Sequence, residues 1–218
     1  MIEILFENSD FIACVKPVGV QSQCDGAEDM VKLLKEQAGS EIFPIHRLDT
    51  NVGGTMIFAK NKKSAADLSA LINNRQFEKT YLAVAEGIPQ TPSGTFEDFL
   101  YKDKRKNKSF VVKRERKGVR RAVLDYNVLE STNDKSLVSV RLHTGRSHQI
   151  RVQFASRKMP LVGDGKYGSR DNGCKIALWS HRIEFKLNGR AFCFRSYPDT
   201  EEYPWNLFNY DNYILSEG

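Results

Sequence analysis

A hairpin pattern near the end of the chain restricts the fold more than any other segment. Residues 183–194 read IEFKLNGRAFCF, in which two runs of β-strand composition flank Asn188 and Gly189. Asn-Gly favours the positive φ angles of a two-residue turn and is the strongest short signal for a β-hairpin. The segment therefore predicts two antiparallel strands joined by a tight turn.

Other segments also have the composition of strands. In residues 79–87, KTYLAVAEG, the side chains from Tyr81 to Ala85 alternate with the period of a strand that has two distinct faces. Further predicted strands cover residues 11–17, 54–60, 121–130 and 135–144.

Three segments have helical spacing instead. Residues 29–39 place their apolar side chains on one face and end at Gly39, which suits a C-terminal cap. Two more helices are expected in residues 64–76 and 147–157, with Ser64 and Ser147 as their N-caps.

Many strands with few helices favour an α+β fold over a regular βαβ repeat. We expect a mixed, largely antiparallel central sheet that is flanked by helices and loops. Since neither an internal repeat nor a flexible Gly/Ser linker divides the sequence, we expect a single domain over residues 1–218.

The composition is that of a globular protein, with 40% hydrophobic and 28% charged residues. The sequence contains neither a run of eighteen apolar residues nor a basic, apolar leader, so we expect a cytoplasmic protein that does not enter a membrane. Its four cysteines form no C-x-x-C pair, which argues against a zinc knuckle or a thioredoxin-like motif. We expect reduced thiols.

The positive charge is concentrated in one stretch. The chain carries a net charge of +6, and residues 102–121 hold eleven lysines and arginines against Asp103 and Glu115. A loop or hairpin with this composition repels itself unless a negative partner binds to it. The stretch therefore predicts a polyanionic partner.

The segment HRLDTNVGG, residues 46–54, is a polar loop that leads into a predicted strand. Its simplest interpretation is a surface turn in which Asp49 caps a backbone group. Alternatively Asp49 is held for chemistry, because Arg47 lies two residues away and can keep a carboxylate ionised. The glycines Gly53 and Gly54 would let backbone or a planar ligand approach closely.

A second polar segment, residues 142–154, reads LHTGRSHQIRVQF and brings Arg146 and Arg151 to the start of a predicted helix. Free backbone N–H groups at a helix start favour a phosphate or a carboxylate such as Asp49. A solvated basic helix is an equally good interpretation of this segment alone.

Two other patterns favour structural roles. Residues 163–168, GDGKYG, match the G-x-G-x-x-G pattern but are not followed by a helix, so a tight turn is favoured over a nucleotide site. The four histidines do not have metal-ligand spacing, so we expect no metal site.

Taken together, four segments resemble the RluA-type family of RNA pseudouridine synthases, in the family's order and with comparable gaps. KPVGV resembles its KPaG segment, HRLDTNVGGTMIFAK its HRLDxxTSGxxxxAK signature, and KTYLAVAEG its K-x-Y-x-A-x-V-x-G strand. The block LHTGRSHQIRVQFASRKMPLVGDGKYG resembles TGRxHQIRxH…PIxGDxxYG. The resemblance implies the pseudouridine synthase fold, in a short form without the N-terminal S4 domain that many relatives carry.

The resemblance also implies catalytic roles. Asp49 would be the essential carboxylate, acting on the base or the ribose of a target uridine. Tyr81 would stack on the flipped uracil and help to move the proton from C5. Arg151 would pair with Asp49 and keep it charged.

For RNA binding, Arg47 would occupy the space that the flipped base leaves. Residues 102–121 would form a clamp for the phosphates of structured RNA, either tRNA or large-subunit rRNA. The predicted RNA-binding residues are Arg47, Arg146, Lys166, Lys104, Arg105, Lys113 and Arg114. Neither a cofactor nor a metal is implied, and a monomer is the family-like state.

The chain departs from the family pattern at two places. Val52, Gly53 and Gly54 stand where the family usually has Thr-Ser-Gly, and Gln153 stands where it usually has His. Two alternative functions are a non-catalytic RNA-binding protein and an N-glycosidase that releases the base. The paired Asp49 and Tyr81 argue against the first alternative, and the second would need a positioned water.

Overall fold

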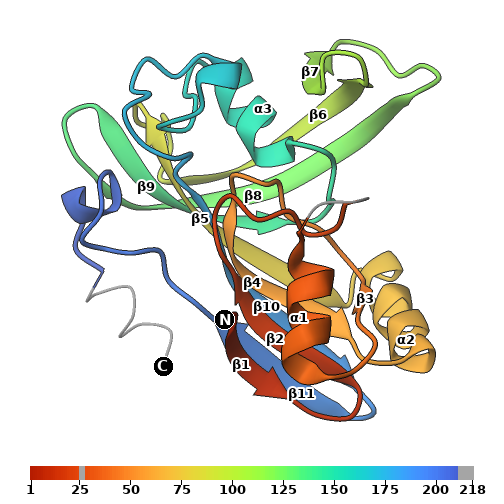
Figure 1. Ribbon diagram of the computed structural model, residues 1–218. Coiled ribbons are helices and arrows are strands. Elements are labelled where there is room, and N and C mark those ends of the chain that lie inside the picture. Colours follow the sequence, from red (N-terminus) through yellow and green to blue (C-terminus); the bar gives the residue numbers. More distant parts are fainter. Residues whose placement is uncertain (25–27, 211–218) are drawn as a thin grey trace. The chain divides into compact units, whose positions relative to one another are not determined.

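The computed structural model of the chain describes residues 1–24 and 28–210 (Figure 1). Two compact units make up the fold. The first unit contains Met1–Thr80 and Trp179–Pro198, and the second contains Tyr81–Leu178 and the described residues from Asp199 onward.

The first unit is a sheet with two helices. Its strands lie in the order β1-β2-β4-β10, with β3 paired to β4 and β11 paired to β10. The β4–β10 pair is parallel, whereas β1–β2, β2–β4, β3–β4 and β10–β11 are antiparallel. Its elements are β1 (Glu3–Glu7), β2 (Phe11–Lys16), α1 (Met30–Ala38), β3 (Phe43–Pro44), β4 (Gly53–Ala59), α2 (Lys62–Asn73), β10 (Leu178–Leu187) and β11 (Arg190–Arg195).

The second unit contains a run of antiparallel strands, in the order β9-β8-β6-β7. Strand β5 contributes Phe77–Thr80 to the first unit and its remaining residues to the second. The elements are β5 (Phe77–Glu86), β6 (Ser93–Asp103), β7 (Lys108–Val112), β8 (Val119–Ser131), β9 (Lys135–Leu142), α3 (Gln149–Ser156) and two 3-10 turns, Gly165–Tyr167 and Trp205–Leu207.

These elements confirm the predicted α+β class with a mixed, largely antiparallel sheet. Asn188 and Gly189 have φ angles of 51° and 79°, and Leu187 pairs with Arg190, so the predicted Asn-Gly hairpin is confirmed. The basic stretch was expected as a loop or hairpin, and it forms the β6–β7 hairpin and the start of β8. The short strand β1 and the long strand β6 were not predicted from the sequence.

Each unit has its own apolar core. In the first unit a cluster of buried side chains includes Phe11, Ile57, Leu68 and Phe185, so the sheet packs against α2 through Leu68. The second unit has a smaller cluster of Leu100, Ala122 and Val152, which joins β6 and β8 to α3. Burial of these side chains supplies the main stabilising term for each sheet and its helices. None of the helices in the described part of the chain is both long and apolar enough to cross a membrane.

The helix ends correct two predictions. Gly39 caps α1 with a left-handed φ of 60°, as expected. Helix α2, however, begins earlier than predicted, because Asn61 is its N-cap and its side chain accepts a hydrogen bond from the Ser64 N–H at 2.8 Å. The prediction of Ser64 as the cap was wrong, and its hydroxyl donates to Asp10 instead.

The start of α3 was also predicted wrongly. The N-cap position is His148, not Ser147, and it has a left-handed φ of 54° without a side-chain cap. Gln149 replaces the expected cap, since its Oε1 accepts hydrogen bonds from the Thr144 hydroxyl at 2.7 Å and the Arg146 N–H at 3.0 Å. The turn before the helix is therefore closed from inside the helix.

Two glycines allow β4 to approach β10 closely. A Cβ atom at Gly53 would lie 2.4 Å from the Trp179 ring, and one at Gly54 would lie 2.3 Å from the Ser180 carbonyl oxygen. Gly54 also has a φ of 116°, which disfavours any side chain. The expectation of close backbone contact is confirmed at Gly54, which meets the Ser180 backbone of β10, whereas Gly53 is covered by the Trp179 ring.

Candidate active site

The loop that carries Asp49 connects β3 to β4 and is fixed on both sides of this residue. Leu48, only 5% exposed, is held by Ser22, whose hydroxyl donates to the Leu48 carbonyl and accepts from the Leu48 N–H, each at 2.9 Å. The Val52 N–H donates to the Asp49 carbonyl at 3.0 Å and closes a turn. Asp49 is half-buried in this turn and Arg47 is exposed beside it.

Lys16, at the end of β2, is hydrogen-bonded to the same loop. Its ammonium group donates to the carbonyl oxygens of Pro17 at 2.8 Å, Val20 at 2.6 Å and Thr50 at 3.2 Å. Burial lowers the pKa of Lys16 to about 8, an effect that the Asp49 carboxylate partly opposes. Lys16 is thus a buried cation near Asp49, with all three of its ammonium donors used.

His46 supports the other end of the loop. Its Nε2 accepts a hydrogen bond from the Ile57 N–H at 3.1 Å, so the proton of the neutral ring is on Nδ1. Burial holds the pKa of His46 well below its ordinary value, and the positive charge of Lys79 acts in the same direction. His46 therefore has a structural role in joining the loop to β4.

Tyr81 lies on β5 in the second unit. The side chain is only 6% exposed, and every residue from Tyr81 to Ala85 is buried. The alternation in this segment thus marks a strand covered on both faces. A buried ring on a regular strand has few rotamers, so the orientation of the Tyr81 ring is well defined.

Arg151 lies in the first turn of α3 and forms a buried pair with Asp164. Its Nε and Nη2 donate to the two carboxylate oxygens at 2.6 Å and 2.8 Å. The side chains are 7% and 0% exposed, so this is a planar, charge-assisted pair in a dry environment. Asp164 belongs to the GDGKYG segment, whose predicted role as a tight turn is confirmed by the 3-10 turn that follows it.

The same segment supplies Tyr167, which joins Arg151 to the basic hairpin. The Arg151 guanidinium lies 5.1 Å from the centre of the Tyr167 ring. The Tyr167 hydroxyl accepts from the Ser109 N–H of β7 at 2.8 Å and lies 2.9 Å from the His148 Nδ1. Arg151 therefore rests on a network that reaches β7.

Two predicted RNA-binding residues lie at the edges of this network. The Lys166 ammonium donates to the Asn107 carbonyl at 3.0 Å, which ties the GDGKYG segment to the β6–β7 turn. The exposed Arg146 donates from Nε to the Arg121 carbonyl of β8 at 3.0 Å. Both side chains thus lie beside the basic stretch.

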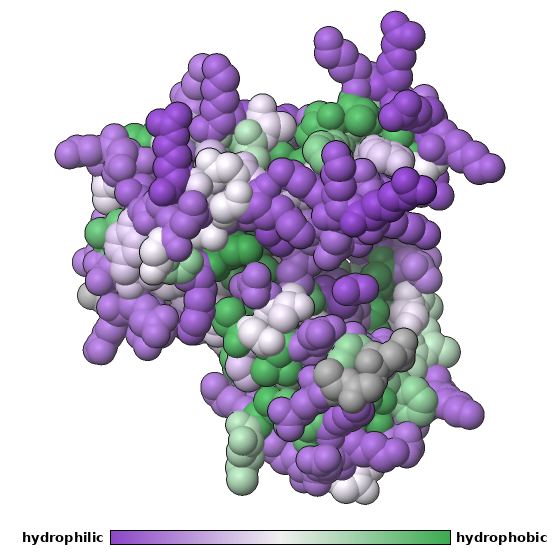
Figure 2. All heavy atoms as spheres, turned by 45° about the horizontal axis from the view of Figure 1, so that its top comes forward, coloured by the Kyte–Doolittle hydropathy of each residue, from purple (hydrophilic) through white to green (hydrophobic). Residues whose placement is uncertain are grey.

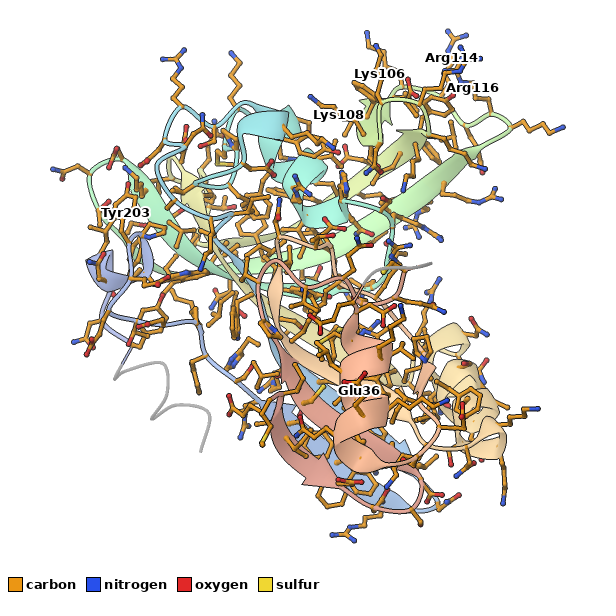
Figure 3. All side chains as sticks on the ribbon, viewed as in Figure 1. Glu36, Lys106, Lys108, Arg114, Arg116 and Tyr203 are labelled. Carbon is orange, nitrogen blue, oxygen red and sulfur yellow. The ribbon has the colours of Figure 1, made fainter. Side chains whose placement is uncertain are left out.

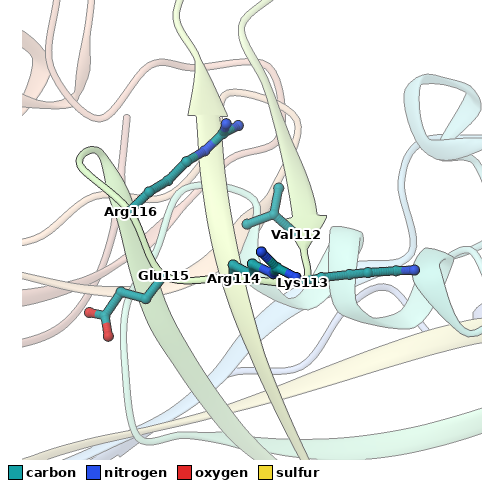
Figure 4. Close-up of a pocket in the computed structure, with 5 residues that line it drawn as sticks. All are labelled: Val112, Lys113, Arg114, Glu115 and Arg116. Atoms are coloured by element: carbon teal, nitrogen blue, oxygen red, sulfur yellow. The ribbon is translucent and has the colours of Figure 1, made fainter.

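The basic stretch itself presents its charges outward. Lys104 and Arg105 lie in the β6–β7 turn, and Lys113 and Arg114 lie in the β7–β8 loop, all of them exposed. Figure 3 shows Lys106, Lys108, Arg114 and Arg116 gathered around this hairpin, and Figure 4 shows an open hollow in the loop. The hollow is lined by Val112, Lys113, Arg114, Glu115 and Arg116.

The histidines have structural partners. His143 Nε2 lies 2.6 Å from Asp125, and His181 Nδ1 lies 2.9 Å from the Ser196 carbonyl oxygen. Over residues 1–24 and 28–210, no group of three or more His, Cys, Asp or Glu side chains is placed to hold a metal ion.

Two residues of the site received no role from the sequence. Lys16 belongs to the KPVGV segment, and Asp164 to GDGKYG, so both lie in segments that resemble family motifs. Their contacts join residues 34 and 13 positions apart, which a local pattern does not encode. Asp49 lies in the first unit, and Tyr81 and Arg151 lie in the second. That the three form one active site stays a prediction.

Comparisons with known proteins match most of the chain. The family model described as RNA pseudouridylate synthase matches residues 10–156, which include Asp49, Tyr81 and Arg151. A ribosomal large subunit pseudouridine synthase D of Borreliella burgdorferi is 30% identical over 207 residues, covering 88% of this chain and 63% of its own. The chain therefore spans less than two thirds of that relative's length.

Two other relatives match over most of both chains. An uncharacterized RNA pseudouridine synthase of Zymomonas mobilis is 32% identical over 189 residues, 83% of this chain and 86% of its own. A tRNA pseudouridine synthase C of Haemophilus ducreyi is 31% identical over 216 residues, 91% and 87% of the two chains.

The fold is similar to that of two solved human structures. RNA pseudouridylate synthase domain containing 1 aligns with a TM-score of 0.81 and 20% identity, over 100% of this chain and 94% of that one. RNA pseudouridylate synthase domain containing 4 aligns with a TM-score of 0.77 and 22% identity, over 90% of this chain and 89% of that one. The observed architecture is thus the pseudouridine synthase fold. With the matching family model and the four motifs in order, this chain belongs to the RNA pseudouridylate synthase family and is of its RluA type.

Proposed function

We propose that the protein is an RNA pseudouridine synthase that isomerises specific uridines in structured RNA, either tRNA or large-subunit rRNA. The observation that carries this proposal is the family match, which spans Asp49, Tyr81 and Arg151 together. The relatives' names include both a tRNA and a ribosomal large subunit enzyme. They therefore support the reaction but do not choose between the two RNA targets.

In the proposed reaction Asp49 is the essential carboxylate. The bond between N1 of the uracil and C1′ of the ribose breaks, the base turns, and C5 forms a new bond to C1′. The proton leaves C5, and N1 gains one, so no atom or electron is lost overall. Asp49 either adds covalently or stabilises the charge that develops as the glycosidic bond breaks. An internal rearrangement of this kind needs neither a cofactor nor a metal ion.

Three further residues have proposed roles in these steps. Tyr81 would stack on the turned base and help to move the proton from C5. Arg151 would pair with Asp49 and keep it ionised, while Asp164 and Tyr167 hold the guanidinium in place. Lys16 would hold the Asp49 turn through the Thr50 carbonyl.

RNA binding would involve both units. Arg47, exposed beside Asp49, would enter the space left by the flipped base. Arg146, Lys166 and the hairpin side chains would contact phosphates. The proposed phosphate contacts on the hairpin are Lys104, Arg105, Lys113 and Arg114.

We further propose that the protein acts as a monomer in the cytoplasm, with residues 1–218 working as a single catalytic domain. The four cysteines all lie within the described residues and form no disulfide, which fits a reducing compartment. Both tRNA and ribosomal RNA are found there, so the proposed substrates and the proposed compartment agree.

A map of pseudouridine in total RNA tests the proposed reaction. RNA from a strain that lacks the gene is incubated with the protein, and pseudouridine is detected by primer-extension stops after carbodiimide treatment. We expect new stops that disappear with Asp49→Asn, and their position identifies the target uridine. Glu36→Gln makes the same carboxyl-to-amide change at an exposed position on α1 and should leave the stops unchanged (Figure 3).

The same incubation separates the alternative functions. Release of free uracil would identify an N-glycosidase, and RNA binding without either product would identify a non-catalytic binding protein. Asp49→Asn that retains full activity would overturn the role of this carboxylate.

A further inference from the structure

The β6–β7 hairpin has two chemically different faces. Along β7, Ser109 and Val111 point to the side of α3, because Ser109 donates to the Ser147 carbonyl at 2.7 Å and Val111 packs on the Val152 cluster. Successive side chains of a strand point to opposite faces, so Phe110 and Val112 face away from α3.

Strand β6 adds two aromatic side chains to the face turned away from α3. Tyr101 is paired with Phe110, and Phe99 is paired with Val112, in the antiparallel register of the hairpin. Residues opposite one another in such a pair share a face and contact each other. Phe99, Tyr101, Phe110 and Val112 thus form one apolar group, which we call the outer hairpin face.

Part of the outer hairpin face is open to solvent. Phe110 is 37% exposed, which is unusual for a phenylalanine, and the other three side chains are half-buried. Val112 also lines the hollow of the β7–β8 loop (Figure 4). At the upper right of Figure 2, where Figures 1 and 3 place this hairpin, hydrophobic atoms lie exposed between long hydrophilic side chains.

Cations border these rings. The Arg116 guanidinium lies 5.6 Å from the centre of the Tyr101 ring. The Lys108 ammonium lies 5.9 Å from the centre of the Phe110 ring, although it donates to the Lys166 carbonyl and lies closer, at 5.0 Å, to the Tyr167 ring. Arg121, paired with Phe99 in the register, borders the same face and bonds to Glu97. Flat rings bordered by lysine and arginine fit a ligand that carries both planar groups and negative charge.

We infer that the outer hairpin face binds unpaired nucleotides of the substrate RNA, with a base stacked on Phe110 and flanking phosphates held by the adjacent lysines and arginines. This inference rests on the proposed function and extends it from phosphate contacts to contacts with bases. Single-stranded nucleic acid is bound in general by a positive groove with aromatic stacking platforms. The bases of an RNA duplex are stacked within the helix and do not reach such a ring. The substrate would thus have a single-stranded segment beside the paired region.

Tryptophan fluorescence reports directly on stacking at this position. Phe110→Trp introduces an exposed indole on the outer hairpin face, and the wild-type signal of the two native tryptophans is subtracted. We expect a short single-stranded RNA to quench the new indole, and an RNA duplex of the same length to leave it unquenched. Ile88→Trp is the matched control, because Ile88 is 47% exposed and precedes β6, at the opposite end of that strand from the β6–β7 turn.

Affinity measurements separate stacking from charge. Phe110→Leu keeps an apolar side chain but removes the flat ring, so we expect binding of the single strand to weaken about 5- to 150-fold. Phe110→Tyr should restore it. An abasic ribose-phosphate strand of equal length carries the same charge, and its affinity should be the same for the wild type and Phe110→Leu.

Two results together would overturn the inference: the wild type binds the normal and the abasic strands equally well, and Phe110→Leu has no effect on affinity. The hairpin would then contact phosphates alone. These measurements involve no turnover and can be repeated with Asp49→Asn. Failure of stacking is therefore distinguishable from failure of the proposed reaction, which the pseudouridine map detects.

Discussion

Lys16 shows how one side chain can hold the turn that carries Asp49. Its hydrogen bonds to Pro17 and Val20 hold the segment that follows β2, and the bond to Thr50 joins this segment to the Asp49 turn. Carbonyl oxygens replace water around the ammonium group, which offsets the cost of its burial. The nearby Asp49 carboxylate favours the charged form. The geometry of the loop therefore depends on the protonation of Lys16.

This protonation gives stability a defined pH dependence. The pKa of Lys16 is about 8 in the folded protein, against an ordinary value of 10.5 for an unfolded chain. Between these values the unfolded state binds more protons, so the Lys16 contribution to the free energy of unfolding rises with pH. We expect the free energy of unfolding of the wild type, minus that of Lys16→Met, to rise between pH 8 and 10.5 and to be constant below pH 8.

Urea unfolding over this pH range checks the prediction. Lys63→Met removes a lysine that is exposed on α2 and controls for the loss of one positive charge. A difference that falls with pH, or stays flat throughout, would contradict the assigned burial of Lys16.

Gln153, one of the two departures from the family pattern, has a structural role. Its Nε2 donates to Asp98 at 2.7 Å and to the Phe96 carbonyl at 3.2 Å, which joins α3 to β6. Arg157 donates to the same Asp98 carboxylate at 2.9 Å and lies over the Phe96 ring. Gln153 therefore helps to hold α3 on β6 within the second unit.

At the scale of elements, helix α3 depends on bonds to segments on either side of it. Gln149 closes the turn before the helix, Gln153 joins it to β6, and Arg151 joins it to the GDGKYG segment. Its sequence has weak amphipathic spacing, since residues 149–154 are all buried. Tertiary contacts therefore hold this short helix, which is expected because a helix of eight residues has little stability alone.

Removal of Asp164 tests this dependence. Asp164→Asn removes the negative charge that pairs with the buried Arg151 guanidinium. We therefore expect the free energy of unfolding to fall by about 3–5 kcal/mol. Glu97→Gln breaks the exposed pair with Arg121 and should have a much smaller effect, since water and salt screen exposed pairs. Urea unfolding measures both variants, and an equal loss in the two would contradict the structural importance of the buried pair.

The helix starts also show the limits of local patterns. Ser64 and Ser147 are both good capping residues, yet the structure uses Asn61 and a left-handed His148. Asn61 is an equally strong cap and begins the helix three residues earlier than Ser64 would. The geometry at His148 depends on Gln149 and on Tyr167, 19 residues away, so the spacing of apolar residues did not reveal it.

At the scale of the whole molecule, we expect the uneven distribution of a net charge of +6 to govern the proposed association with RNA. Lysines and arginines that release counterions from RNA make the affinity fall with salt. Lys113→Glu/Arg114→Glu should raise KM and reduce the slope of log affinity against log salt by about 1–2, because each lost phosphate contact lowers the slope by about 0.7–0.9. Single-turnover chemistry at saturating RNA should be nearly unchanged.

A matched variant isolates position from charge. Lys62→Glu/Lys63→Glu makes the same change in net charge at exposed positions on α2. Its KM and salt slope should stay closer to those of the wild type. Equal effects of the two variants would indicate that net charge matters and the hairpin does not, and a loss of chemistry at saturating RNA would contradict the proposed clamp.

The sequence by itself determined the class of fold, the Asn188–Gly189 turn, the family and the position of the basic hairpin. Each of these follows from a local or repeated property: the period of apolar side chains, the φ preference of two residues, a run of charges, or motifs in order. The tertiary structure decided the partners. Lys16 binds the Thr50 carbonyl, Arg151 pairs with Asp164, and β10 packs onto glycines of β4. These contacts depend on which segments folding brings together. Burial strengthens them because water no longer competes for the same polar groups.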